Sequence, residues 1–311
     1  MAEKIATREA YGNALAEFGE IYKDLVVLDA DVSSATKTAT FGKKFPDRFI
    51  NCGIAEGNMV SVAAGIATTG KIPFASSFAM FAAGRAFEPI RNAIGYPHLN
   101  VKIGATHAGI TVGEDGATHQ CCEDIGIMRT IPGMMIINPA DAVEARAAVE
   151  AAILYKGPVY LRFGRLAVPV IFDRDTYKFE LGKGIQISEG KEASIIATGI
   201  MVGEAIKARE ILAGDNIDAA VVNIHTIKPI DKEIIIKAAK TGAIVTAEEH
   251  NIIGGLGSAV AEVLCENAPC RMGRVGIADE FGRSGKAEEL MKIFGLTAED
   301  IAKKVKDVLQ L

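Results

Sequence analysis

The chain has 311 residues, a hydrophobic fraction of 49% and a net charge of −5, which suits about two domains with substantial cores. Its basic residues form no arm or stripe, which argues against nucleic-acid binding, and no stretch reaches the ~18 apolar residues of a membrane span. The N-terminal segment MAEKIATREAYGNALAEF has a charged, helical pattern without an apolar signal core, so we expect a cytoplasmic protein.

Short apolar runs alternate with helical patterns in the first half of the chain. Residues 55–69 and 141–154 have helical periodicity. Such alternation is typical of a parallel sheet covered by helices. The predicted strands are LVVLDA (25–30), RFINC (48–52), IPFASS (72–77), NVKIGAT (100–106), GMMIIN (133–138) and VYLRF (159–163).

The rhythm breaks between residues 168 and 193, where the chain is polar and irregular. We interpret this stretch as a linker, with a boundary near residue 185. Further predicted strands follow it: ASIIATG (193–199), AAVVNI (219–224), AIVTAEEH (243–250) and RVGIAD (274–279). We therefore expect an α/β protein of two domains, residues 1–180 and 190–311, each with a mainly parallel sheet flanked by helices.

The five cysteines are Cys52, Cys121, Cys122, Cys265 and Cys270, and no two of them form a C-x-x-C pair. An odd count without that spacing argues against a zinc site or a disulfide framework. We expect all five to be reduced and to behave as small apolar residues.

Glu56 follows the strand RFINC and a glycine turn, and it opens a helix rich in small residues. A carboxylate at this position can simply favour the helix N-terminus, an effect of ~0.3–1 kcal/mol. It can also serve a ligand, because ligands bind at the carboxyl ends of parallel strands.

Phe78 and Phe81 are three residues apart in SSFAMFAAGRAF, a spacing that puts two side chains on one helix face. Core packing would explain them. An aromatic pair can also stack on a planar heterocycle.

The stretch GITVGEDGATHQ (109–120) combines glycines with Asp115 and His119 at a strand exit. It lacks the pattern of a Walker loop, of a dinucleotide-binding turn and of a calcium loop. Carboxylate and imidazole groups bind hydroxyls, so a sugar site fits, although an ordinary turn with a helix cap has the same composition. Downstream, GGLGSA (254–259) indicates helix packing in the second domain, and Glu248, Glu249 and His250 are expected at an interface without a chemical role.

Six segments together resemble the second half of transketolase, in the order of that family: TREAYGNALAEF, VVLDADVSSAT, NCGIAEGNMVSVAAGIA, SSFAMF, THAGITVGEDGATHQ and YLRFGR. EEHNIIGGLGSA in the second domain fits the same group. The resemblance covers essentially the whole chain. It implies the pyrimidine-binding and C-terminal domains of a thiamine-diphosphate enzyme.

For the cofactor, the resemblance implies that Glu56 hydrogen-bonds the ring nitrogen of the aminopyrimidine, and that Phe78 and Phe81 surround that ring. Phe81 is expected to be the stacking partner, and Gly84 replaces a third aromatic residue of the family. Burial favours the protonated form of a carboxylic acid, which suits Glu56 to hold a proton at that nitrogen.

For the substrate, the resemblance implies that Asp115 and His119 bind the hydroxyls and the carbonyl end of the donor sugar. Arg8, His107 and Arg165 match positions that hold the sugar phosphate. His107 and His119 are also expected to move protons during the reaction.

Two further positions complete the comparison with the family. Asp31 matches an acid near the substrate channel. A family serine of the phosphate site aligns with Ala35, and Ser34 is an alternative. The implied reaction moves a two-carbon ketol unit from a ketose phosphate to an aldose phosphate.

The family's GDG motif and its downstream Asn, which hold the cofactor's diphosphate through a divalent metal such as Mg²⁺, have no counterpart in this sequence. The resemblance therefore implies the C-terminal subunit of a split transketolase, without a metal site of its own. An N-terminal partner subunit would carry the GDG motif and the metal, and an α2β2 assembly is expected.

Three other interpretations share the fold. The β subunit of a 2-oxoacid dehydrogenase would not need GEDGATH or the phosphate-site arginines. A fragment of deoxyxylulose-phosphate synthase would share GEDG-x-TH but usually differs at His107. A non-catalytic scaffold subunit would not need Glu56, Asp115 and His119 together.

Overall fold

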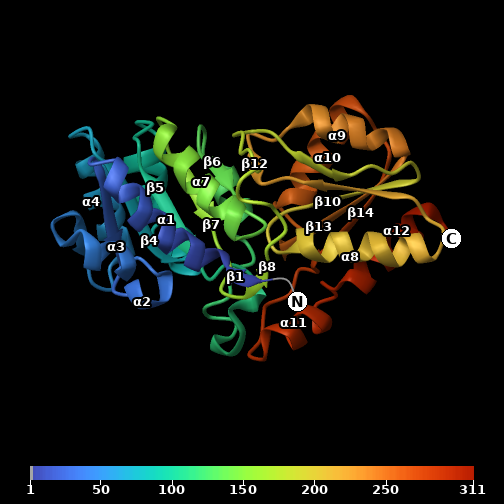
Figure 1. The fold of residues 1–311 in the computed structure, drawn as a ribbon, viewed down its shortest axis with the longest axis horizontal. Helices are drawn as coiled ribbons and strands as arrows, with labels where there is room; N and C mark the ends of the chain where they lie inside the picture. Colours follow the sequence, from blue (N-terminus) through green and yellow to red (C-terminus); the bar gives the residue numbers. More distant parts are fainter. Residues whose placement is uncertain (1–2) are drawn as a thin grey trace.

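The computed structural model describes residues 3–311, which form two α/β domains side by side (Figure 1). The first domain is built on a seven-stranded sheet with the strand order β12-β6-β7-β5-β4-β2-β3. Its strands are parallel except for β12. They are β2 (Leu25–Asp29), β3 (Phe49–Asn51), β4 (Ile72–Phe78), β5 (Lys102–Thr106), β6 (Met135–Ile137), β7 (Val159–Arg162) and β12 (Thr226–Lys228).

Helices cover both faces of this sheet because its central strands are apolar on both sides. In β2, Leu25 and Val27 pack into one core cluster while Val26 and Leu28 pack into another, as the alternation of a strand requires. One face carries α1 (Thr7–Ile21), α3 (Ala39–Lys44) and α7 (Ala142–Leu154). The other carries α4 (Glu56–Ala67), η2 (Phe81–Arg85), α5 (Phe87–Pro89), η3 (Ile90–Gly95) and α6 (Asp124–Arg129).

The second domain is built on a five-stranded sheet with the order β14-β13-β10-β11-β9, in which only β9 is antiparallel among residues 3–311. Its strands are β9 (Ile185–Ser188), β10 (Ala193–Ala197), β11 (Ala219–Asn223), β13 (Ala243–Asn251) and β14 (Arg271–Ile277). The sheet lies between α9 and α10 on one side and α8 and α12 on the other (Figure 1). These helices, with α11, are α8 (Met201–Gly214), α9 (Lys232–Ala238), α10 (Leu256–Asn267), α11 (Ala287–Ile293) and α12 (Ala298–Leu309).

The remaining short elements lie outside these two sheets. β1 (Lys4–Ala6) and β8 (Ala167–Pro169) pair antiparallel with each other. The others are α2 (Ser33–Thr36), η1 (Pro46–Arg48), η4 (Ile110–Asp115) and η5 (Ala239–Thr241).

The structure confirms the two-domain α/β architecture and each predicted strand, within one or a few residues at each end. It corrects the N-terminal pattern, because residues 4–6 form β1 and the helix begins only at Thr7; residues 1–2 lie outside the described part. The predicted linker also contains β8 and β9, so the second sheet starts at Ile185. The division into residues 1–180 and 190–311 stays a proposal. Because β9 belongs to the second sheet, residues 185–188 go with the second domain.

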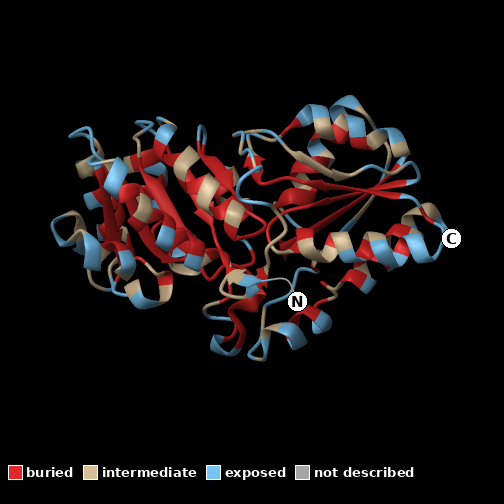
Figure 2. Cartoon of the chain, viewed as in Figure 1, coloured by how far each residue is buried: buried red, intermediate tan, exposed pale blue. Residues whose placement is uncertain are grey.

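Strand β12 was not predicted, and it joins the two domains. Thr226 pairs with Ile137 and Lys228 with Ile136, so a segment from the second domain forms one edge of the first domain's sheet. Lys228 Nζ also donates to the carbonyls of Arg129 and Ile131, at the end of α6. The buried residues run continuously across this junction (Figure 2).

A buried ion pair links β7, α6 and β13. Arg162 Nε lies 2.9 Å from Asp124 Oδ2, and the two side chains are 3% and 0% exposed. Arg162 Nη2 also donates to the carbonyl of Glu249 at 2.9 Å, across the domain boundary. Neighbouring acids, Asp124 foremost, hold the pKa of Arg162 above its ordinary value against the effect of burial.

Asp124→Asn should lower the free energy of unfolding by ~3–5 kcal/mol, because it leaves the guanidinium of Arg162 buried without an opposite charge. Urea unfolding followed by circular dichroism measures this loss. Lys237→Ala is the control: it removes an exposed ion pair with Glu189, for which we expect a loss of ~0–1 kcal/mol. Similar losses for both variants would contradict the role of the buried pair.

Candidate active site

The predicted site residues follow the carboxyl ends of neighbouring strands. Asp31 comes after β2, Glu56 after β3, Phe78 at the end of β4, His107 after β5 and Arg165 after β7. These strands are adjacent in the order β7-β5-β4-β2-β3. The sheet therefore brings five separated segments to one edge, where ligands of parallel α/β folds bind.

Glu56 is the first residue of α4 and is 4% exposed. Ser77 Oγ, near the end of β4, donates to Glu56 Oε1 at 3.4 Å. Arg85 Nη1 lies 3.4 Å from Glu56 Oε2, although the Arg85 side chain is 55% exposed. The carboxylate thus has one buried hydroxyl partner and one partner that reaches in from the surface.

Phe78 and Phe81 do not share a helix, which corrects the sequence prediction. Phe78 is the last residue of β4, and Phe81 begins the π-helical turn η2. The rings nevertheless stack, with centroids 5.8 Å apart and an interplanar angle of 13°. The spacing of three residues had suggested a helix face, but the strand continues through SSF because Ser76, Ser77 and Phe78 are all buried in the sheet.

Two histidines extend this aromatic pair. The His107 ring stacks on the Phe78 ring, with centroids 3.8 Å apart. The His119 ring meets the Phe81 ring edge-on, with centroids 5.3 Å apart. On Phe81, the guanidinium carbon of Arg85 lies 4.2 Å from the ring centroid. The result is a connected cluster of planar groups that ends at Glu56.

His107 is 2% exposed and has a φ of 57°. Its Nε2 lies 3.0 Å from Arg8 Nη1, and because arginine only donates, Nε2 must be the acceptor. The Nδ1–H group then donates to Thr106 Oγ1, 2.9 Å away. Burial, followed by the positive charges of Arg8 and Arg165, lowers the pKa of His107 to about 3.

Arg8 lies between His107 and the backbone after β2. Its Nη1 donates to the carbonyl of Ala35 at 2.8 Å, while its Nε is buried without a partner. Burial and the charge of Arg165 lower the pKa of Arg8. An unpaired buried donor next to a second arginine is suited to an anion.

The glycine loop, residues 109–120, holds Asp115 and His119. Gly109, Gly113 and Gly116 all have φ between 75° and 87°, a region that favours glycine. Asp115 is exposed, and His119 Nδ1 lies 2.9 Å from Thr118 Oγ1.

Of the other predicted substrate residues, Arg165 contacts this loop. Arg165 Nη1 donates to the carbonyl of Val112 and lies 3.5 Å from a carboxylate oxygen of Glu114. Asp31, which has a φ of 64° and is exposed, accepts from Asn51. Ser34 is exposed.

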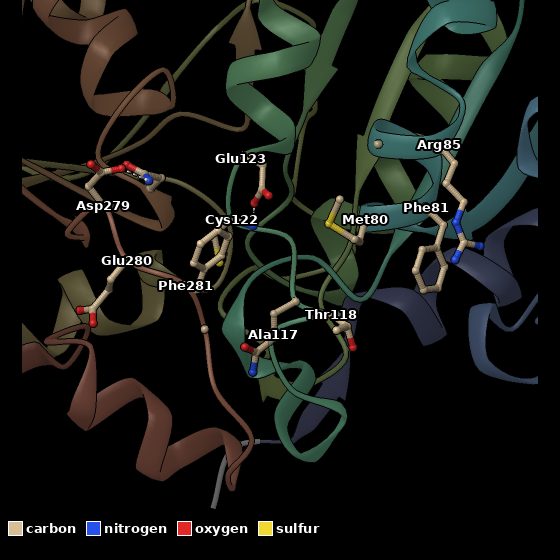
Figure 3. A pocket seen from close by; sticks show the side chains of 14 residues that line it. Met80, Phe81, Arg85, Ala117, Thr118, Cys122, Glu123, Asp279, Glu280 and Phe281 are labelled. Atoms are coloured by element: carbon tan, nitrogen blue, oxygen red, sulfur yellow. Dashed lines mark hydrogen bonds between the residues drawn. The ribbon is translucent and has the colours of Figure 1, made fainter.

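A cavity of about 660 Å³ opens beside the cluster, between the two domains. Figure 3 shows Phe81 and Arg85 on one side of it and Asp279–Phe281 of the second domain on the other. Gly84 and Thr118, the latter from the glycine loop, also line the cavity. Of the predicted site residues, Phe81 lines this cavity, whereas the others, including Glu56, Asp115 and His119, are not among its lining residues.

Comparisons with known proteins match this architecture. The transketolase pyrimidine-binding domain matches residues 3–170, and the transketolase C-terminal domain matches residues 182–301. The chain belongs to the transketolase family.

Individual relatives cover nearly the whole chain. It is 54% identical over 305 residues to a "Putative transketolase C-terminal section" of Methanocaldococcus jannaschii, covering 97% of this chain and 96% of that relative. It is 44% identical to a 6-deoxy-6-sulfo-D-fructose transketolase subunit of Clostridium sp. (strain MSTE9), over 97% and 94% of the two chains. A solved structure described as "Split gene transketolase, inactive beta4 tetramer" is 52% identical, covers 99% of both chains and superposes with a TM-score of 0.92.

The transketolase family implies thiamine diphosphate and a divalent metal, and the residues of this chain fit the aminopyrimidine. The guanidinium of Arg85 is itself a planar N–H donor, and it lies on the Phe81 ring within reach of the Glu56 carboxylate. A flat group with an N–H donor therefore has both a stacking surface and an acceptor here. Among residues 3–311, no group of three or more His, Cys, Asp or Glu side chains is placed to hold a metal ion.

The sequence did not single out Arg85, Ser77, Gln120 or residues 279–282. Arg85 reaches Glu56 from the end of η2, in a different element from α4, and residues 279–282 reach the site through domain packing. The GEDGATHQ motif did contain Gln120, but its spacing gives no indication that the amide is buried.

The imidazole of His107 should remain neutral down to about pH 4. Its pKa of about 3 lies below the unfolded value of ~6.5, so the free energy of unfolding should fall as the pH drops through this interval. Imidazole NMR of the labelled chain, with His107→Gln to assign the signal, measures the titration. A midpoint near the unfolded value would contradict the arrangement with Arg8.

Proposed function

We propose that this chain is the C-terminal subunit of a two-subunit, thiamine-diphosphate-dependent transketolase. The proposed reaction moves a two-carbon ketol unit from a ketose phosphate to an aldose phosphate. The observation that carries the proposal is the buried Glu56 carboxylate beside the stacked Phe78–Phe81 pair, at the sheet edge that also holds the glycine loop. When bound, thiamine diphosphate supplies the nucleophilic carbon and the electron sink that this transfer needs.

In this proposal, Glu56 holds a proton at the ring nitrogen of the aminopyrimidine. The carboxyl group is buried at the sheet edge and accepts from Ser77 Oγ, which fixes its position for a partner on the ring. Phe81 offers its face to the ring, so Arg85 must move from that face when the cofactor binds. The 55% exposure of the Arg85 side chain supports such a movement.

At the sugar end, we propose that Asp115 and His119 bind hydroxyls and the carbonyl end of the donor. Arg8 and Arg165 would bind the terminal phosphate, and the unpaired Nε of Arg8 supports this role. His107 would act as a neutral group that orients Arg8, and its expected role in moving protons, like that of His119, stays part of the proposal. Asp31 and Ser34 remain candidates at the rim of the channel.

A partner subunit with the GDG motif would hold the diphosphate and the metal in an α2β2 enzyme of the cytoplasm. The lack of GDG in this sequence supports the partner, as do relatives described as a C-terminal section and as a split-gene transketolase. Within residues 3–311, no helix is long and apolar enough to cross a membrane.

The isolated chain should lack ketol-transfer activity and bind thiamine diphosphate weakly, because it has no GDG site for the diphosphate and metal. Titration calorimetry with cofactor and Mg²⁺ measures the affinity, and light scattering of the mixture with the partner measures the assembly. Micromolar or tighter binding by the chain alone would contradict the split-subunit proposal. A stable 1:1 heterodimer that turns over substrate would contradict the α2β2 assembly.

Glu56→Gln should lower activity of the reconstituted enzyme by ~10²–10⁴-fold, the usual effect of losing a positioned acid–base group. Glutamine keeps the size of the side chain but cannot supply the acid proton. Hydrogen–deuterium exchange at the cofactor's C2 carbon reports this step directly. Glu189→Gln, on the surface of the second domain, is the control, and wild-type exchange in Glu56→Gln would remove Glu56 from the mechanism.

Arg165→Ala should raise KM for a phosphorylated donor more than it lowers kcat, because a phosphate contact mainly supplies binding. Hydroxypyruvate, which has no phosphate, should be little affected, whereas Asp115→Ala should weaken both donors. Arg165 also bonds to the carbonyl of Val112, so a purely structural role would impair both donors equally. Steady-state kinetics of the reconstituted enzyme with both donors decides between these outcomes.

A further inference from the structure

The glycine loop belongs to the first domain, but the second domain holds it at both ends. At its start, Thr111 N donates to Glu249 Oε1 at 2.7 Å. Glu249 lies in β13 and is 3% exposed. The loop backbone passes so close to this side chain that a Cβ on Gly109 would lie 2.2 Å from the carboxyl group of Glu249.

At the other end, the Gln120 amide connects three backbone carbonyls. Gln120 Nε2 donates to Ile110 at 3.1 Å and to Gly113 at 3.3 Å, both within the loop, and to Arg283 of the second domain at 2.9 Å. The side chain is 3% exposed. One group therefore closes the loop on itself and attaches it to the neighbouring domain.

The segment Gly282–Ser284 packs closely against the glycine loop. A Cβ on Gly282 would lie 1.8 Å from Gln120 Oε1, so the amide occupies the space that a side chain would need. Ser284 Oγ donates to the carbonyl of Glu114, next to Asp115. Asp115 itself is exposed, so its position depends on the backbone that these contacts hold.

We propose that the second domain is the positioning element of the glycine loop, in which Glu249 and the segment Gly282–Ser284 hold Asp115 and His119 in place for the sugar. These residues act through their contacts with the loop, so they are positioning residues. The inference rests on the proposed sugar-binding role of the loop. A loop with three glycines at positive φ is flexible in isolation, and ordering it before the substrate arrives removes that entropic cost from binding.

Gly282→Ala tests the proposal with a small change on the surface segment, far in sequence from the loop. Its methyl group should displace the Gln120 amide and free the loop. In the full chain, hydrogen–deuterium exchange of residues 109–120 should become faster while the melting temperature stays the same. In the reconstituted enzyme, KM for the donor sugar should rise roughly tenfold, with a smaller effect on kcat.

Three further variants separate positioning from general packing. Ser284→Ala should produce a weaker effect of the same kind. Lys286→Ala, two residues beyond this segment, changes an exposed side chain that pairs with Glu289 and should match wild type. Glu249→Gln keeps an acceptor for Thr111 N and should retain most of the loop protection that Glu249→Ala loses.

Unchanged exchange and unchanged KM in Gly282→Ala would overturn the positioning role. A rise in KM matched by an equal fold decrease in kcat, together with a lower melting temperature, would also overturn it. If the wild-type complex moves no ketol unit, the proposed function fails instead. The exchange data on residues 109–120 still decide whether the second domain orders the loop.

Discussion

The buried guanidinium of Arg162 is the constraint on which the arrangement of the two domains depends. A buried charge needs an opposite charge and hydrogen-bond partners, because desolvation is otherwise too costly. Arg162 finds Asp124 at the start of α6, the carbonyl of Glu249 in β13 and, at 3.4 Å, the carbonyl of Cys121. Asp124 also accepts from Tyr160 in β7. One side chain thus fixes the sheet of the first domain, the exit of the glycine loop and the inner strand β13 of the second domain against one another.

This junction divides the candidate site into two halves with different supports. The half around Glu56, Phe78 and Phe81 is built from β4, α4 and η2, all within the first domain. The half formed by the glycine loop lies against the second domain, through Glu249 at one end and residues 282–284 at the other. A change in domain packing would therefore move the proposed sugar-binding groups while leaving the proposed cofactor-binding groups in place.

The positive charges of the site repel one another. Arg8, Arg165 and His107 lie close enough that burial and mutual repulsion lower the pKa of both Arg8 and His107. Like charges brought together in this way are stabilised when an anion binds between them.

Local pattern was sufficient to predict the two α/β domains, the strands and the edge of the sheet at which the site residues gather. Apolar runs such as LVVLD are typical of strands buried on both faces of a parallel sheet, and this one forms β2. Residues that follow parallel strands meet at one edge of the sheet. The motifs GIAE and GEDGATHQ were specific enough to identify the family and to name Glu56, Asp115 and His119.

The local pattern did not predict the contacts between segments that are distant in the sequence. Strand β12 pairs with β6 across about ninety residues, the π-helical turn η2 replaces a predicted helix face, and Arg85, Gln120 and Glu249 meet partners far away in the chain. Periodicity records only which side of an element is apolar, whereas these contacts depend on how two folded surfaces satisfy each other's buried polar groups. For that reason, the sequence indicated where the proposed site lies, and the packing of the two domains determined what holds its residues in place.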